Sequence, residues 1–241
     1  MSKRKARPVY RFGRSRQALR NGLELDFIGG PRPGRGVVVA DPGAVRKALE
    51  RFDPEAPWKK VRDRVLPMLP RARPVPGPDL ELVRAMLPPG VLVNFGIDVG
   101  PAVVFVGAPL LDRWQIDAAT LIETSLENVR RLADECDRRD VLDDQVAGIP
   151  VSILQTPFGI AASMLLVPEH LERFFGRGPH LLLAPMRDLL LALPAGVDRE
   201  FAGWLAEELE AIDPNHLHLG GFLHERGSIM PEVLDEAAAR A

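Results

Sequence analysis

The feature of this sequence that most constrains its fold is an alternation, over residues 91–226, of short β-rich runs with longer segments of helical apolar spacing. Paired runs around turn residues predict four hairpins: Val91–Asp98 with Ala102–Val106, Pro150–Gln155 with Ile160–Val167, His180–Ala184 with Leu189–Leu193, and His216–Leu219 with Phe222–Glu225. Apolar periodicity predicts the helices between them, at 117–138, 168–175 and 198–212. The order predicts an α+β fold in which antiparallel β-hairpins alternate with amphipathic helices packed on the sheet.

The rest of the chain divides by composition. Residues 1–36 are rich in Arg, Gly and Pro and predict a basic, poorly structured arm, and residues 233–241 predict a tail. Residues 37–88 predict a small α/β segment before a main domain at 89–232. That segment has a predicted strand at Val37–Ala40 and three predicted helices. The first starts at Pro42 after the N-cap Asp41, and the others extend over Trp58–Leu69 and Leu80–Leu87.

Cysteine content and apolar run length limit the class of protein. The single cysteine, Cys136, excludes an intrachain disulfide and lies on the apolar face of its predicted helix, which predicts a core position. No apolar run reaches the length of about 18 residues that spans a bilayer, and no apolar segment follows the basic N-terminus as in a secretory signal. We therefore expect a cytoplasmic protein with no membrane segment.

The basic arm offers one possible partner. Residues 3–20 contain eight Lys and Arg side chains and no acidic residue, although the net charge of the chain is −2. Such a segment can hold nucleic-acid phosphates by counterion release. A solvated tail explains the same composition, so both interpretations stay open.

Four segments resemble the YtpQ-like family of uncharacterised bacterial proteins. They are the stretch Trp58–Pro70 with its terminal Leu-Pro, the Leu-Glu-Asn-Val-Arg-Arg-Leu run at 126–132, the Ser-Met-Leu-Leu-Val-Pro-Glu run at 163–169, and the Pro-Met-Arg-Asp-Leu-Leu-Leu run at 185–191. The resemblance implies an α+β fold and a bacterial origin, and it implies no reaction. The basic arm and the segment His216–His224 have no counterpart in this resemblance.

The C-terminal histidines are the candidates for a metal site. His216 and His218 are two residues apart and would share one face of a strand, and a turn at Gly220-Gly221 would return His224 near them. Three imidazoles suit zinc or a similar divalent metal. The alternative is a polar face on an edge hairpin, and no motif such as HExxH supports a cofactor.

Four further side chains are candidates for ligand binding. Arg187 and Asp188 occupy a predicted tight turn, where a guanidinium held by a carboxylate would grip an anion, or the carboxylate would accept hydrogen bonds from its own backbone. Asn128 lies at the edge of an apolar helix face. Because asparagine is a poor helix former, its place there predicts a hydrogen bond to a neighbouring loop or to a ligand. Glu127 lies one turn from Glu123, a spacing that could bind a cation or provide an acid and a base. A solvated helix face explains the same spacing.

Three functions follow from these features. The first is a non-enzymatic interaction or adaptor protein, because no catalytic constellation is present and hairpins offer edge strands to a protein partner or a second copy of the chain. The second is a metal-dependent enzyme or metal binder that uses His216, His218 and His224. The third is a nucleic-acid-associated protein that uses the basic arm.

Overall fold

The computed structural model describes residues 14–18, 24–28, 42–70, 81–100, 102–156, 159–211 and 216–234. The chain divides into two compact units, Met1–Val39 and Ala40–Ala241. In the first unit, β1 (Arg14–Ala18) pairs antiparallel with β2 (Glu24–Ile28). The predicted strand Val37–Ala40 and the cap Asp41 lie outside the described residues.

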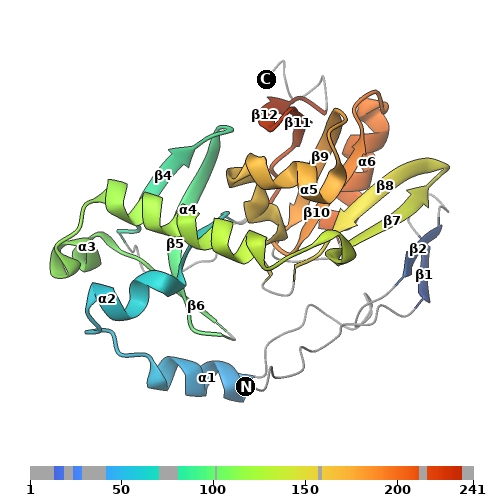
Figure 1. Ribbon diagram of the computed structural model, residues 1–241. Coiled ribbons are helices and arrows are strands. Elements are labelled where there is room, and N and C mark those ends of the chain that lie inside the picture. The colour runs from blue at the N-terminus through green and yellow to red at the C-terminus, as the bar shows by residue number, and fades with distance from the viewer. Residues whose placement is uncertain are drawn as a thin grey trace, which may run out of the picture. The chain divides into compact units, whose positions relative to one another are not determined.

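The second unit confirms the α+β fold, with two antiparallel sheets (Figure 1). The larger sheet has the strand order β12 (Ser228–Glu232), β11 (Gly221–Glu225), β9 (His180–Met186), β10 (Leu189–Pro194), β8 (Ile149–Leu154) and β7 (Val141–Val146). In the smaller sheet, β5 (Val91–Asp98) lies between β3 (Val65–Met68) and β4 (Arg84–Leu87), and β6 (Val103–Phe105) also pairs with β5. β3 and β5 belong to one sheet, so residues on both sides of position 88 fold together.

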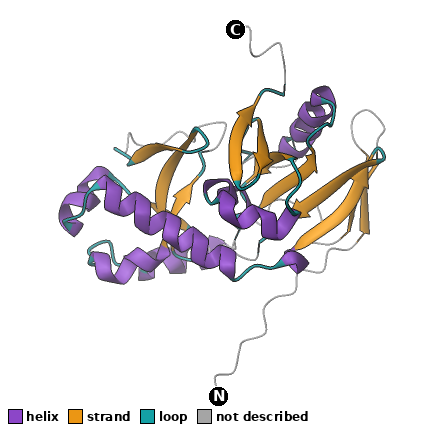
Figure 2. Cartoon of the chain, turned by 45° about the horizontal axis from the view of Figure 1, so that its top comes forward, coloured by secondary structure: helices purple, strands orange, loops and turns teal. Residues whose placement is uncertain are grey.

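Helices lie against both sheets, as Figure 2 shows. The helices are α1 (Pro42–Arg51), α2 (Trp58–Val61), α3 (Ala108–Trp114), α4 (Ala118–Asp134), α5 (Leu171–Phe175) and α6 (Arg199–Glu210), with short 3-10 turns η1 (Arg62–Arg64), η2 (Arg138–Asp140), η3 (Ala161–Leu166) and η4 (Pro168–His170). α4 packs on β3 and α6 packs on β9. As predicted, Asp117 and Asp198 cap α4 and α6 by accepting hydrogen bonds from backbone N–H groups of the first turn.

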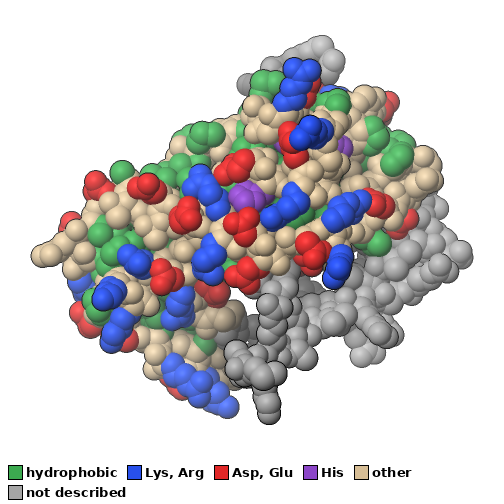
Figure 3. Space-filling model, viewed as in Figure 1, with side chains coloured by type: hydrophobic (Ala, Val, Ile, Leu, Met, Phe, Trp, Pro, Cys, Tyr) green, Lys and Arg blue, Asp and Glu red, His purple; other side chains and the backbone are tan. Residues whose placement is uncertain are grey.

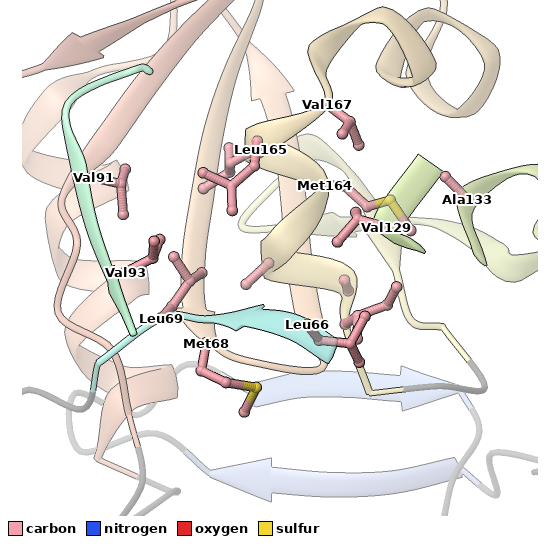
Figure 4. Close-up of a cluster of buried hydrophobic side chains, with 14 of the residues drawn as sticks. Leu66, Met68, Leu69, Val91, Val93, Val129, Ala133, Met164, Leu165 and Val167 are labelled. Atoms are coloured by element: carbon pink, nitrogen blue, oxygen red, sulfur yellow. The ribbon is translucent and has the colours of Figure 1, made fainter. Parts of the chain in front are cut away.

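The main core forms where α4, η3 and the smaller sheet meet. Figure 4 shows Leu66 and Leu69 from the β3 stretch together with Val129 from α4 and Met164 from η3. All these side chains are buried, and so is Cys136, as its predicted core position required. Strand β3 is therefore enclosed by segments that lie far from it in the sequence.

Two of the four predicted hairpins are confirmed. β5 pairs with β6, and β9 pairs with β10. The second prediction is wrong, because residues 161–166 form η3, and β8 pairs instead with β7 around Ala147-Gly148. The fourth is also wrong, because residues 216–220 contain no strand and β11 pairs with β12 around Arg226-Gly227. Both observed turns have positive φ at each central residue, which is the geometry that favours a two-residue hairpin.

Two predicted helices each end in a strand. Only Trp58–Val61 of the stretch 58–69 is α-helical, and Val65–Met68 is β3. Pro67 explains this, because proline lacks the N–H that a helix interior needs. The stretch 84–87 is β4, in which Ala85 and Leu87 face the core and Met86 is exposed. Burial that alternates in this way is typical of a strand and not of a helix. The helix α3 was not predicted.

Candidate functional site

The outer edge of β3 is closed by side chains instead of by another strand. The carbonyls of Val65, Pro67 and Leu69 point away from β5, because alternate residues of a strand offer their hydrogen-bonding groups to the same side. Three side chains donate to them: Asn128 Nδ2 to Val65 O at 2.9 Å, Ser163 Oγ to Pro67 O at 3.4 Å, and Arg187 Nη2 to Leu69 O at 3.1 Å. We call these three donors the β3 clamp.

Asn128 is the most enclosed polar group of the β3 clamp. Its side chain is 5% exposed, and Nδ2 also donates to Arg62 O at 2.7 Å. The amide nitrogen therefore reaches two backbone carbonyls, one in η1 and one at the start of β3. The sequence predicted a hydrogen bond from Asn128 to a neighbouring loop, and the structure shows bonds to η1 and β3 instead. The predicted ligand role of Asn128 stays a prediction.

Arg187 and Asp188 occupy the turn between β9 and β10, as predicted. The Arg187 backbone carbonyl accepts a hydrogen bond from Ala162 N at 3.0 Å, while its guanidinium reaches Leu69 O. Arg187 thus joins the larger sheet to both η3 and β3. Glu127 lies apart from this turn on the exposed face of α4, where its carboxylate is 3.6 Å from Arg130 Nη1.

The stretch Trp58–Pro70 and the segments 126–132, 163–169 and 185–191 meet at the β3 clamp. The stretch Trp58–Pro70 contains β3 itself, and the segments 126–132, 163–169 and 185–191 supply Asn128, Ser163 and Arg187 respectively. The contacts of these segments therefore describe one structural unit, in which the strand edge is protected from water and from other strands.

The three predicted metal ligands are placed differently from one another. His218 has a positive φ of 53°, is exposed, and its Nδ1 is 2.9 Å from Glu210 Oε2. His216 precedes β11 in a segment without strand pairing, whereas His224 lies within β11. Among the residues that the structure describes, no three His, Cys, Asp or Glu side chains are grouped as metal ligands.

A different pair of histidines comes together. His224 is directly opposite His180 in the β9–β11 ladder, and their rings are near parallel, with an angle of 17° and centroids 6.1 Å apart. His224 is fully buried. Neither of its ring nitrogens has a hydrogen-bond partner among the described residues, and the same holds for His180 Nδ1.

The surroundings of this histidine pair favour neutral imidazoles. Burial lowers the pKa of His180 below its ordinary value. Burial also lowers the pKa of His224, and the charge of His180 adds to this effect, whereas Glu172 on α5 acts in the opposite direction. The Phe175 ring lies 6.3 Å from the His180 ring. Sequence reasoning missed the pair, because only the register of two strands distant in sequence brings it together.

A second feature is the apolar outer face of the smaller sheet. Met86 and Leu92 are cross-strand partners on β4 and β5. Phe105 on β6 is opposite Gly96, which faces the same side of β5 as Leu92. The three apolar side chains are 66%, 40% and 38% exposed in that order, and we call them the outer apolar face.

Charge is distributed differently from apolar surface. On the side of the molecule in Figure 3, acidic and basic side chains are interspersed, with no extended surface of one sign among the described residues. The basic segment 3–20 lies outside the described residues except for Arg14–Ala18, so its role in nucleic-acid binding stays a prediction. No helix in the described part of the chain is both long and apolar enough to cross a bilayer.

Comparison of the chain with models of known protein families, with curated proteins and with solved structures finds no match.

Proposed function

We propose that this chain is a non-enzymatic interaction protein that binds an extended segment of a partner protein along β4 and across the outer apolar face. The observation that carries the proposal is the exposure of Met86, Leu92 and Phe105 on one side of three neighbouring strands. Exposed apolar side chains that gather on one side of a sheet are typical of interaction sites, whereas scattered ones are not.

The edges of the described sheets differ in how open they are to an added strand. The β3 edge is occupied by the β3 clamp. β12 contains Pro231, and β7 carries Asp143 and Asp144, and both proline and charge discourage strand pairing. β4 lies at a sheet edge, has neither a proline nor an acidic residue, and carries Met86 of the outer apolar face, so it is open to an added strand.

Strand addition also defines the chemistry of the partner. Main-chain hydrogen bonds to β4 would supply affinity, and alternate side chains of the bound segment would reach the outer apolar face. Met86 is unbranched and adapts to apolar groups of different shape. The exposed Arg84 at the start of β4 favours an acidic residue in the segment.

Selection from a phage-displayed library of random peptides on the immobilised full chain tests this proposal. We expect enrichment of peptides with alternating apolar residues and an acidic residue. For a synthetic peptide of that sequence, Leu92→Asp should weaken binding about tenfold or more, because burial of the exposed part of a leucine is worth about 1.4 kcal/mol.

Leu49→Asp is the matched control, because Leu49 on α1 is 46% exposed and Leu92 is 40% exposed. Peptide affinities that fall equally in both variants, or a selection without enrichment, would refute the proposal. A concentration-dependent dimer that Leu92→Asp abolishes, with no peptide enriched, would also overturn it and would make a second copy of the chain the occupant.

A further inference from the structure

Hydrogen bonds along the edge that contains β4 fix which backbone groups are open to an added segment. Just before β4, Val83 N donates to Val106 O at 3.0 Å. Ala108 N donates to Glu81 O at 2.9 Å. The two residues on either side of Leu82 therefore bond toward the chain that follows β6. Since the direction of bonding alternates along a strand, both backbone groups of Leu82 point to the open side.

The same alternation continues through β4. At its far end the Leu87 carbonyl faces β5, because it accepts a hydrogen bond from Gly90 N in the turn at 2.7 Å. Arg84 and Met86 therefore turn their N–H and C=O groups to the open side, as Leu82 does. The Met86 side chain is exposed, and residues two apart in a strand share one face. All three side chains thus lie on the side of the outer apolar face.

We propose that β4 binds an extended segment antiparallel to itself, with an acidic side chain at the centre of the segment and an apolar side chain two residues away on either side. This alignment rests on the proposed function, in which β4 accepts a strand. Leu82, Arg84 and Met86 are spaced so that an antiparallel segment of about five residues exchanges two hydrogen bonds with each of them. A parallel segment needs about seven residues for the same bonds, because each bond reaches a residue beside the one directly opposite.

The centre of the segment follows from the charge of Arg84. Arg84 is exposed, and its cross-strand partner on β5 is the neutral Asn94. Within the described part of the chain, no acidic side chain forms an ion pair with the Arg84 guanidinium. Directly opposed residues of neighbouring strands place their side chains on the same face. A carboxylate on the residue opposite Arg84 therefore meets a guanidinium that no described acidic group neutralises.

The two apolar positions differ in size, and this difference sets the order of residues in the segment. Met86 is 66% exposed, and Leu92 beside it on β5 is 40% exposed, so a large apolar side chain opposite Met86 covers the most surface. Leu82 is only half-exposed, so less apolar surface is open there. In an antiparallel segment the residue opposite Met86 comes first, and the residue opposite Leu82 comes last. The partner sequence therefore reads large apolar, any residue, Asp or Glu, any residue, small apolar.

Fluorescence anisotropy of labelled peptides with the full chain tests the position of the acid. The probe is Leu-Thr-Asp-Thr-Val with Gly-Ser flanks and blocked ends, and a second peptide has Arg in place of Asp. We expect the native chain to bind the Asp peptide about fivefold more tightly than the Arg peptide, and Arg84→Glu to reverse this preference. Arg51→Glu on α1 is the matched control, because it makes the same change of net charge at an exposed arginine outside β4 and should keep the native preference.

Disulfide trapping of the bound peptide tests its direction. The chain carries Met86→Cys in a Cys136→Ala background, because Cys136 is the only native thiol. The peptide carries Cys either in place of its first residue, Leu, or in place of its last, Val. We expect Met86→Cys to trap the peptide with the first-position Cys in higher yield, and Leu82→Cys in the same background to prefer the last-position Cys. Equal yields, or preferences exchanged between the two variants, would overturn the antiparallel alignment.

Failure of the alignment and failure of the binding role give different results. Peptides that lose affinity in Leu92→Asp, but keep the native preference in Arg84→Glu, overturn the alignment and leave strand addition at β4 in place. A library selection that enriches peptides of another order, while the Asp peptide does not bind, has the same consequence. A selection without any enrichment refutes the proposed function and the alignment together.

Discussion

Replacement of Asn128 by leucine tests whether the β3 clamp stabilises the fold. Leucine has the same branching at Cγ as asparagine and continues α4; its methyl groups are bulkier than the amide, and it donates no hydrogen bond. Asn128→Leu therefore removes the bonds to Val65 O and Arg62 O while it leaves the helix intact. A ligand-binding asparagine would behave in the opposite way, because its removal would leave stability unchanged or raise it.

The structure sets the expected size of the effect. Two hydrogen bonds contribute about 0.5–1.5 kcal/mol each, and the Val65 carbonyl, left buried without this donor, adds about 1–3 kcal/mol. The better helix propensity of leucine offsets about 0.5 kcal/mol. We expect Asn128→Leu to lower the free energy of unfolding by about 1.5–5.5 kcal/mol, which is a large part of the stability of an ordinary domain.

Urea denaturation followed by far-UV circular dichroism measures this difference by linear extrapolation. The control is Glu127→Ala, because Glu127 is the adjacent residue, is exposed on α4, and makes only a solvated ion pair with Arg130. The control should change the free energy of unfolding by less than about 0.5 kcal/mol. A change below about 1 kcal/mol for Asn128→Leu, well under the sum of the two bonds and the unpaired carbonyl, would refute the structural role of the clamp.

Two further predictions concern the smaller sheet and the β7 edge. Gly96→Ala should lower the free energy of unfolding by about 1–3 kcal/mol, because an added Cβ would lie 2.2 Å from Val103 Cγ1. The control is Gly196→Ala, because a Cβ added there meets nothing within 4 Å. Equal losses of stability in the two variants would contradict the clash at Gly96. The Ser152 hydroxyl and a nearby arginine lower the pKa of Asp143 in the folded chain, so its stabilisation is present above the ordinary aspartate pKa and is lost as the pH falls through the folded value. Urea midpoints of the native chain and Asp143→Asn should therefore differ at neutral pH and converge in acid, and a constant difference would contradict this assignment.

The β3 clamp has a consequence for how the two sheets hold together. Its donors come from α4, η3 and the β9–β10 turn, and its acceptors lie on β3 or, for Leu69, directly after it. Loss of one donor therefore loosens the contact between the sheets as well as the β3 edge. Hydrogen exchange of the amides of β3 and β5 in Asn128→Leu would report this loosening separately from global unfolding.

Local sequence signals determined the elements whose structure depends on nearby residues. The caps Asp117 and Asp198 predicted the starts of α4 and α6, because an N-cap acts on its own first turn. Turn residues between apolar runs predicted the β5–β6 and β9–β10 hairpins. The α+β class followed from the alternation of these signals, which needs no knowledge of distant contacts.

Tertiary contacts decided the rest. β7 carries two aspartates and β12 a proline, so neither has the composition of a strand, and each forms because a neighbouring strand pairs with it. Asn128 and Arg187 appeared as possible ligand-binding residues because the carbonyls they bond lie on a strand that is distant in sequence.

The pairing of His180 with His224 depends in the same way on strand register, which only the assembled sheet fixes. Periodicity and capping act over a few residues, and so a sequence can express them directly. Which strands become neighbours, and which polar groups meet as a result, is a property of the packed chain.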